Sequence, residues 1–232
     1  MNGLFFEKLD IGYRTGRSGK KTVAGGLSAT LESGQMTCLL GRNGTGKSTL
    51  LRTLAGLQEP VGGKIVPDLR GRCAVVLTER IDLRNLSVEE VVGLGRTPHT
   101  NFWGTLCDED RAVVGDAMRQ VGIEALATTD FAMLSDGERQ KTLIAKALAQ
   151  QTPIVILDEP TIFLDFPSKR EIFLLLQRLA HEQGKTILLS THDVALAAEF
   201  ADVVWFLDKG VLRTGSVREL PPQNLFLPQK PT

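Results

Sequence analysis

Short apolar runs recur along the chain and alternate with stretches of helical periodicity. Each run has the length and composition of a strand buried on both faces. The runs are residues 36–40, 74–77, 154–157, 186–190 and 203–207. The helical stretches are residues 47–56, about 88–94, 110–121, 137–150, 168–182 and 193–200. This alternation predicts an α/β fold with a mainly parallel sheet.

Two regions depart from the alternation. Residues 4–35 have the pattern of antiparallel β structure, with a turn or loop at 14–21. Residues from about 80 to 150 carry helical patterns and no convincing strand, so we expect a helical lobe inserted into the α/β core. Residues 221–232 form a short, proline-rich tail. We therefore expect a single domain that spans residues 1–232.

Composition narrows the possible classes of protein. Lys+Arg and Asp+Glu both number 27, so the chain lacks the basic excess that nonspecific nucleic-acid binding needs. Cys38, Cys73 and Cys107 are too widely spaced for a disulfide framework or a zinc pattern, and the first two lie in apolar runs as expected for buried thiols. We see no leader and no apolar run of about 18 residues, and so expect a soluble, cytoplasmic chain.

Residues 41–48, GRNGTGKS, fit the phosphate-loop pattern G-x-x-x-x-G-K-[ST] in full. They follow a predicted strand and open a predicted helix, which is the context the motif requires. The three glycines let backbone N–H groups turn toward phosphate oxygens. Lys47 adds a cation for the β- and γ-phosphates, and Ser48 places a hydroxyl for Mg²⁺. An ordinary glycine-rich turn would need none of these features, so we predict the core of a P-loop NTPase.

Carboxylates and a histidine follow two of the other predicted strands. Asp158 and Glu159 end the run 154–157, where Asp158 would help to hold Mg²⁺ through water and Glu159 would polarise an attacking water. His192 follows the next strand, at a strand end that points to the ligand crevice, and can reach the γ-phosphate. Solvated acids and a structural histidine are the alternatives, which the nearby phosphate loop disfavours.

With these motifs, the sequence resembles the ATP-binding cassette (ABC) ATPase family. LSDGERQ (134–140) is similar to the family's signature, whose usual form is Leu-Ser-Gly-Gly-Gln, and FLDF (163–166) is similar to its D-loop, with Asp165 in place. His192 matches the switch histidine. Tyr13 matches the aromatic residue that stacks on adenine, with simple packing as its alternative. The resemblance covers essentially the whole chain, in the family's order.

The signature stretch also has a local physical interpretation. Ser135 followed three residues later by Glu138 is a capping box that starts a helix. Capping does not explain Gly137, which costs about 1 kcal/mol relative to alanine inside a helix. Close approach to a ligand would explain it, and a helix start is an anion site. The resemblance implies that Ser135 and Gly137 bind the γ-phosphate held by a second copy of the chain, in a head-to-tail pair.

Two positions differ from the family's pattern. Thr78 stands where the family usually has a glutamine, and Glu79 is next to it. A hydroxyl from Thr78 or a carboxylate from Glu79, acting through water, can serve Mg²⁺ there, and the sequence leaves this choice open. Asp136 stands where the signature usually has glycine. Its carboxylate would lie near bound phosphate unless it turns outward.

A finer resemblance is to importer ATPases for iron-siderophore, haem and cobalamin uptake, carried by residues 87–99, 108–123 and 134–150. It implies ATP hydrolysis that drives import, with transmembrane permease subunits docked on the helical lobe and a substrate-binding protein delivering the chelate. The chain would lie at the inner face of the cell membrane. A soluble ABC ATPase of Fe–S assembly is the alternative. A small-molecule P-loop kinase would leave the signature, the D-loop and His192 unexplained.

The residues that we expect to act fall into three groups. Catalysis is expected from Glu159, His192 and Lys47. Contacts to ATP are expected from Tyr13, Arg42, Asn43, Gly44, Thr45, Gly46, Lys47, Ser48, Thr49, Ser135, Gly137 and Asp165. Contacts to Mg²⁺ are expected from Ser48, Asp158 and Thr78. The sequence does not specify the cargo, which the partner subunits would select.

Overall fold

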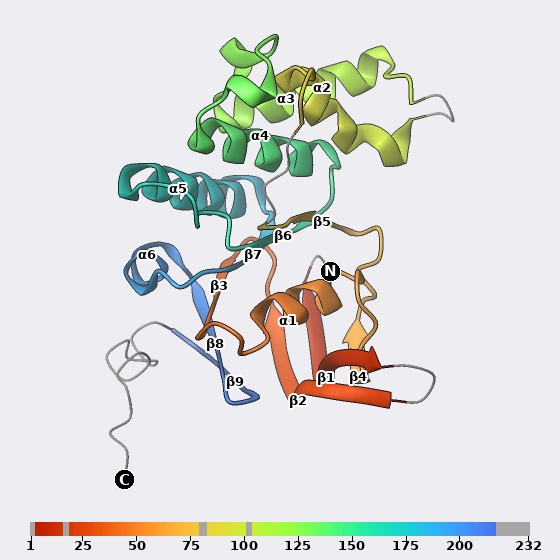
Figure 1. The fold of residues 1–232 in the computed structure, drawn as a ribbon, viewed down its shortest axis with the longest axis vertical. Coiled ribbons are helices and arrows are strands. Elements are labelled where there is room, and N and C mark those ends of the chain that lie inside the picture. The colour runs from red at the N-terminus through yellow and green to blue at the C-terminus, as the bar shows by residue number, and fades with distance from the viewer. Residues whose placement is uncertain (1–2, 16–18, 79–82, 101–103, 217–232) are drawn as a thin grey trace.

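A computed structural model shows two β-sheets, with helices packed around them and a helical lobe on one side (Figure 1). It describes residues 3–15, 19–78, 83–100 and 104–216. The mixed α/β class, the mainly parallel sheet and the antiparallel N-terminal part are as the sequence predicts. Within these described ranges, no helix is both long and apolar enough to cross a membrane.

The larger sheet has six strands and carries most of the motifs at one edge. Its order is β5 (Cys73–Val76), β6 (Ile154–Asp158), β7 (Thr186–Ser190), β3 (Met36–Leu40), β8 (Val203–Asp208) and β9 (Val211–Gly215). All neighbours are parallel except β8 and β9. Every residue of β3, β6 and β7 is buried, as strands covered on both faces require. The carboxyl ends of these parallel strands therefore share one edge of the sheet.

The smaller sheet is antiparallel and has the order β2–β1–β4. Its strands are β1 (Leu4–Thr15), β2 (Gly19–Leu31) and β4 (Gly62–Val66). The sequence did not predict β4, nor β9 in the larger sheet. Both are short edge strands with no fully buried residue, so neither forms an apolar run.

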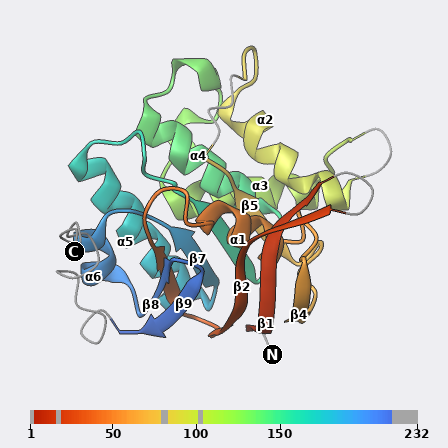
Figure 2. The ribbon, with the colours of Figure 1, turned by 60° about the horizontal axis from the view of Figure 1, so that its bottom comes forward.

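The core lies on both faces of the larger sheet, because alternate residues of its strands point to opposite sides. One buried cluster includes Met36, Val155 and Ile187 and packs against helices, and the other includes Leu39 and Ile156 and packs against α1 and the small sheet. The covering helices are α1 (Lys47–Leu54), α5 (Phe166–Gln183) and α6 (Val194–Phe200). Figure 2 shows α5 and α6 on one side of the larger sheet and the small sheet on the other.

The elements in the described part of residues 83–149 are helices joined by loops. They are α2 (Val88–Gly93), the 3₁₀ helix Leu94–His99, α3 (Asp108–Val121), two short 3₁₀ helices at Glu124–Leu126 and Phe131–Met133, and α4 (Asp136–Ala149). A buried ion pair joins them, since Arg96 Nε lies 2.8 Å from Asp110 Oδ1 and Arg96 Nη1 donates to the Ala149 carbonyl. These pairings tie the ends of α3 and α4 together, so the lobe packs as a unit.

The cysteines agree with the expectation of buried, inert thiols at two positions. Cys38 and Cys73 are buried, whereas Cys107 is exposed at the start of α3. Burial raises the pKa of the Cys38 thiol and raises the pKa of Cys73 to about 11. Both thiols therefore stay protonated and unreactive at neutral pH.

Candidate active site

The phosphate loop leaves β3 and enters α1 through glycines in the left-handed region. Gly44 and Gly46 have φ of 79° and 104°. Gly46 is the N-cap of α1, and no side chain caps the helix. The first turn of α1 carries no acidic residue. The helix therefore begins with N–H groups that are available to an anion, and no carboxylate of its own first turn weakens its positive end.

Lys47 places a cation inside the loop. Only 6% of the residue is exposed, and its Nζ donates to the Gly41 carbonyl at 2.8 Å and the Arg42 carbonyl at 3.4 Å. The same Nζ lies 3.6 Å from Glu159 Oε1. The ammonium group thus sits between the loop and the acidic end of β6, where an incoming phosphate would meet it.

The end of β6 is held by its neighbour β7. Buried Asp158 accepts a hydrogen bond from Ser190 Oγ through Oδ1 at 2.7 Å. The Glu159 N–H donates to that same Ser190 oxygen at 2.9 Å. Glu159 Oε2 lies 3.1 Å from His192 Nδ1. Lys47, Glu159 and His192 therefore form one continuous set of contacts.

An open cavity of about 500 Å³ lies in front of these groups. Its walls combine the phosphate loop with residues from four other segments: Tyr13, Val23, Asn43, Gly44, Gly46, Lys47, Ser48, Thr49, Thr78, Glu159 and Ile162. Tyr13 is half exposed, and its hydroxyl lies 3.0 Å from Thr49 Oγ1. The Thr78 hydroxyl donates to the Asp158 carbonyl at 2.7 Å. The structure thus gathers the aromatic, cationic and acidic residues that the motifs indicate around one space.

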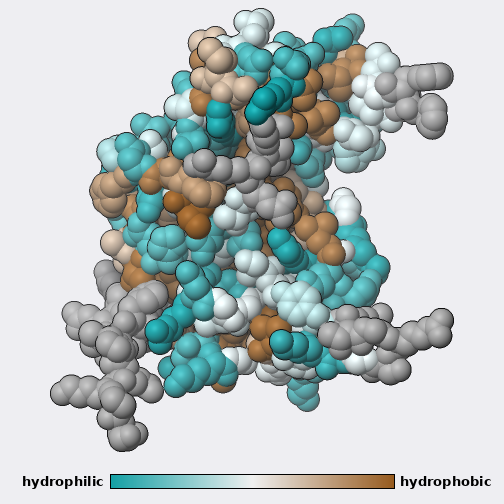
Figure 3. Space-filling view, viewed as in Figure 1, coloured by the Kyte–Doolittle hydropathy of each residue, from teal (hydrophilic) through white to brown (hydrophobic). Residues whose placement is uncertain are grey.

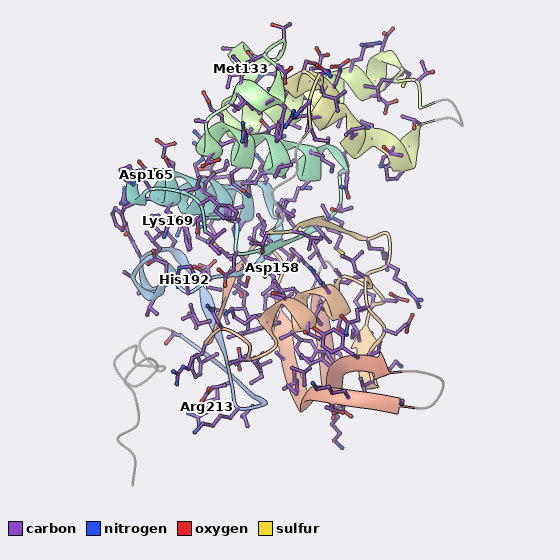
Figure 4. The ribbon with its side chains drawn as sticks, in the orientation of Figure 1. Met133, Asp158, Asp165, Lys169, His192 and Arg213 are labelled. Atoms are coloured by element: carbon purple, nitrogen blue, oxygen red, sulfur yellow. The ribbon has the colours of Figure 1, made fainter. Side chains whose placement is uncertain are left out.

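Other predicted residues lie beside this cavity or far from it. Arg42, Thr45, Asp158 and His192 adjoin it through neighbouring residues but do not line it. Ser135, Gly137 and Asp165 do not line it either. Figure 4 shows Asp165 at the outer end of α5, well away from Asp158. A Cβ on Gly137 would lie 3.7 Å from Ser168 Oγ, so the start of α4 lies against the start of α5.

The start of α4 has the predicted capping box. Ser135 Oγ accepts the Glu138 N–H at 3.3 Å, and Glu138 Oε2 accepts the Ser135 N–H at 2.9 Å. The Ser135 hydroxyl also donates to Glu138 Oε2 at 2.7 Å. These bonds hold the pKa of the Glu138 carboxyl below its usual value, with the Ser135 hydroxyl as the main cause. Within one chain, the Ser135 hydroxyl is thus already engaged.

Asp136 turns along its own helix. Its side chain is 46% exposed, and Oδ1 lies 4.0 Å from Arg139 Nη1, one turn further on. Arg139 also donates to the Ala132 carbonyl and lies over the Phe131 ring, 6.0 Å from the ring centroid. The carboxylate that replaces the usual glycine is therefore exposed and close to a cation. Glu79, the other open question from the sequence, lies outside the described residues.

Sequence reasoning missed Ser190, which contacts both Asp158 and the Glu159 N–H. The available signal is a hydroxyl residue that ends a mostly apolar strand, directly before Thr191 and His192. That signal is weak without knowing that β7 lies beside β6.

A phosphate loop that faces an acidic strand end defines a nucleotide-binding P-loop protein. The chain matches the ABC transporter family over residues 24–162. An uncharacterized ABC transporter ATP-binding protein of Methanocaldococcus jannaschii is 41% identical over 84% of this chain and 70% of that protein. The iron(3+)-hydroxamate import ATP-binding protein FhuC of Bacillus subtilis is 36% identical over 97% of this chain and 87% of its own length.

A comparison with solved structures supports the same family. A chain described as part of a metal-chelate type ABC transporter in an inward-facing conformation has a TM-score of 0.85 and 30% identity, covering 94% of this chain and 85% of its own. The present chain therefore belongs to the ABC transporter family. The family's ATP-binding subunits are ATPases coupled to transport.

Proposed function

We propose that this chain hydrolyses ATP to drive import of a metal chelate, such as an iron-siderophore, haem or cobalamin, through partner membrane subunits. The observation that supports hydrolysis most directly is the set of contacts between Lys47, Glu159 and His192 at the cavity. Import is supported by similarity to an iron(3+)-hydroxamate import protein and to a metal-chelate type transporter. The non-transport alternative in Fe–S assembly has no comparable support.

Each of the three residues has a separate task in the proposed reaction. Lys47 binds the β- and γ-phosphates, because its ammonium group is already enclosed by the loop that would hold them. Glu159 orients and polarises the attacking water, which a carboxylate facing the cavity can do. His192 lies against Glu159 and can donate to the γ-phosphate. Tyr13, half exposed at the cavity wall, offers its ring to adenine.

The donor atoms at the site fit Mg²⁺, which prefers hard oxygen ligands. The Ser48 hydroxyl is exposed at the start of α1, and the Asp158 carboxylate is fixed by Ser190 at the end of β6. Ser48 would bind the ion directly and Asp158 through water. When bound, Mg²⁺ supplies charge neutralisation between the β- and γ-phosphates. Thr78, the third residue expected at the metal, directs its hydroxyl hydrogen to the Asp158 carbonyl.

The edge that carries Ser135, Gly137 and Asp165 suits contact with a second copy of the chain. Phe163 and Phe166, on either side of Asp165, are 48% and 60% exposed. Figure 3 shows apolar side chains on the surface in the region of α5 and over the helical lobe. Exposed apolar groups of this kind commonly mark an interface. We infer a head-to-tail pair in which this edge closes on the nucleotide held by the other copy.

The remaining partners complete the proposed importer. The helical lobe would dock the permease subunits, which places the chain peripherally at the inner face of the cell membrane. A substrate-binding protein would deliver the chelate to the permease. The test is ATP-dependent uptake of an iron chelate into proteoliposomes that contain the chain and a metal-chelate permease with which it co-purifies. Uptake that is equal with and without ATP would contradict the transport role.

The hydrolytic role is tested by Glu159→Gln. Loss of the carboxylate removes the water-polarising group, so we expect turnover to fall at least about 100-fold while ATP binding persists. A dimer should then accumulate with Mg–ATP in size-exclusion chromatography. Glu171→Gln is the matched control, because Glu171 is an exposed carboxylate whose partner is Lys141 on the surface. Normal turnover by Glu159→Gln would show that Glu159 is not the base.

A further inference from the structure

Two hydroxyl groups hold the peptide group that joins Asp158 to Glu159. The Thr78 hydroxyl donates to the carbonyl oxygen of this peptide at 2.7 Å, and Ser190 Oγ accepts its N–H at 2.9 Å. Thr78 follows β5 and Ser190 ends β7, and these strands flank β6 on its two sides. The peptide plane is therefore held from both directions by atoms of neighbouring strands.

The orientation of this peptide decides where the Glu159 side chain points. Glu159 has φ of 46°, in the left-handed region that residues with a Cβ rarely adopt. Such a conformation persists only where the surroundings enforce it. A rotation of the peptide would carry the carboxylate away from Lys47 and His192, which now lie 3.6 Å and 3.1 Å from its two oxygens.

We propose that Thr78 is a positioning residue that, together with Ser190, fixes the Asp158–Glu159 peptide and so aims the Glu159 carboxylate at the attacking water. This inference rests on the proposed hydrolytic function with Glu159 as its base. It assigns Thr78 a task separate from metal binding, because the hydroxyl hydrogen bonds the Asp158 carbonyl whereas a metal would be bound by the lone pairs of the oxygen.

The location of Thr78 also connects its hydrogen bond with the helical lobe. Thr78 lines the nucleotide cavity and also a smaller one, which contains Asp136, Gln140 and Leu143 of α4. The residue thus lies between the Glu159 peptide and the helical lobe. A change in the lobe that shifts Thr78 would act on the reacting carboxylate through a single hydrogen bond.

The experiment compares Thr78→Val with Thr78→Ser. Valine keeps the shape of threonine but lacks the hydroxyl, so we expect kcat to fall about 10- to 100-fold, as for a misplaced catalytic group. The KM for ATP and the Mg²⁺ concentration for half-maximal activity should change less than about twofold. Serine restores the donor, and Thr78→Ser should stay within about threefold of the wild-type kcat.

Thr53→Val is the matched control. It removes a buried hydroxyl that donates to a carbonyl at 2.7 Å within α1, without contact to Glu159. It should lower the melting temperature as much as Thr78→Val does, while kcat stays near wild type. Thr78→Ala serves as a second variant if Thr78→Val is unstable, and a fluorescent ATP analogue reports whether each site is folded.

Three results would overturn the inference. Thr78→Val and Thr78→Ala with wild-type kcat would show that the hydrogen bond has no role in positioning. Recovery of kcat at high Mg²⁺ would show that Thr78 is a metal ligand instead. Equal losses of kcat in Thr53→Val and Thr78→Val would show a purely structural effect. Failure of the hydrolytic function is seen separately, as wild-type protein without ATPase activity or Glu159→Gln with full activity.

Discussion

The starts of α1 and α4 are both candidate anion sites, yet they are built in opposite ways. α1 begins at Gly46 with no side-chain cap and no acidic residue in its first turn. α4 begins with the Ser135–Glu138 capping box and carries Asp136 and Glu138 in its first turn. The start of α1 is thus open to phosphate. At the start of α4, the Ser135 hydroxyl and the Glu138 carboxylate already accept backbone N–H groups.

This difference teaches that a glycine-bearing helix start is not by itself a phosphate site. Phosphate binding depends also on which groups already accept hydrogen bonds from its N–H groups, and on how much negative charge lies beside them. For α4 to accept a phosphate, the Ser135 hydroxyl must exchange its bond to Glu138 for one to the nucleotide. The phosphate loop needs no such exchange, so it is expected to bind ATP first and α4 second.

The largest effect, on ATP binding and turnover, is expected when the start of α1 is blocked. In Gly46→Ala, the new Cβ would lie 2.8 Å from Val23 Cγ1, at a φ of 104° that disfavours alanine. The loop must move, so ATP binding measured by calorimetry should be lost and turnover should fall at least about 100-fold. Gly71→Ala is the control, since Gly71 also has positive φ but faces open space. ATP affinity unchanged in Gly46→Ala would contradict this account of the loop.

A second prediction separates the two helix starts in function. Ser135→Arg places a long cation at α4, outside the nucleotide cavity of its own chain. ATP binding should therefore stay within about threefold of wild type, while hydrolysis is abolished because the pair cannot close on the nucleotide. Calorimetry and a phosphate-release assay measure the two quantities. Wild-type turnover would remove α4 from the composite site.

The smallest effect is expected from substitutions of Glu138. They separate the contribution of its hydrogen bonds from the contribution of its charge. Glu138→Ala removes one half of the capping box and should lower the free energy of unfolding by about 1 kcal/mol at neutral pH. The pKa of Glu138 is lowered in the folded state, so its stabilisation is present above the usual pKa and is lost as pH falls through the lowered one.

Glu138→Gln tests that pH dependence, because glutamine keeps a hydrogen-bond acceptor and does not titrate. Denaturant unfolding of both proteins at about pH 7 and about pH 3 should show a smaller acid-induced loss for the variant than for wild type. Equal losses would mean that the carboxylate charge of Glu138 does not contribute. Glu124→Gln, at an exposed position paired with Arg119, is the control here.

Strands with mostly buried side chains, including the edge strand β5, could be predicted from the sequence, and the exposed edge strands β4 and β9 could not. The runs in β3, β6 and β7 are mostly apolar because helices or the small sheet cover both of their faces. β4 and β9 each have one neighbour and mostly exposed or half-buried side chains. Their sequences, GGKIV and VLRTG, therefore carry no periodic signal.

Part of the candidate site could likewise be predicted from the sequence, and part of it could not. The phosphate loop and the Asp158–Glu159 pair could be read directly, because their residues are consecutive in the chain. The contacts of Thr78 and Ser190 with the peptide between those acids could not be read, because they require the strand order β5–β6–β7. Strand order depends on packing between distant segments, and the pattern along one segment does not encode it.

The connection between β5 and β6 is hydrogen-bonded to the core at both of its ends. These neighbouring strands are parallel, so the chain leaves the sheet at the edge of the nucleotide cavity and returns at the opposite edge. Lys185 donates to the Thr152 carbonyl at the return, and Thr78 donates to the Asp158 carbonyl at the departure. A rotation of the lobe that breaks the Thr78 bond would therefore release the cavity edge, while the bond of Lys185 still holds the return.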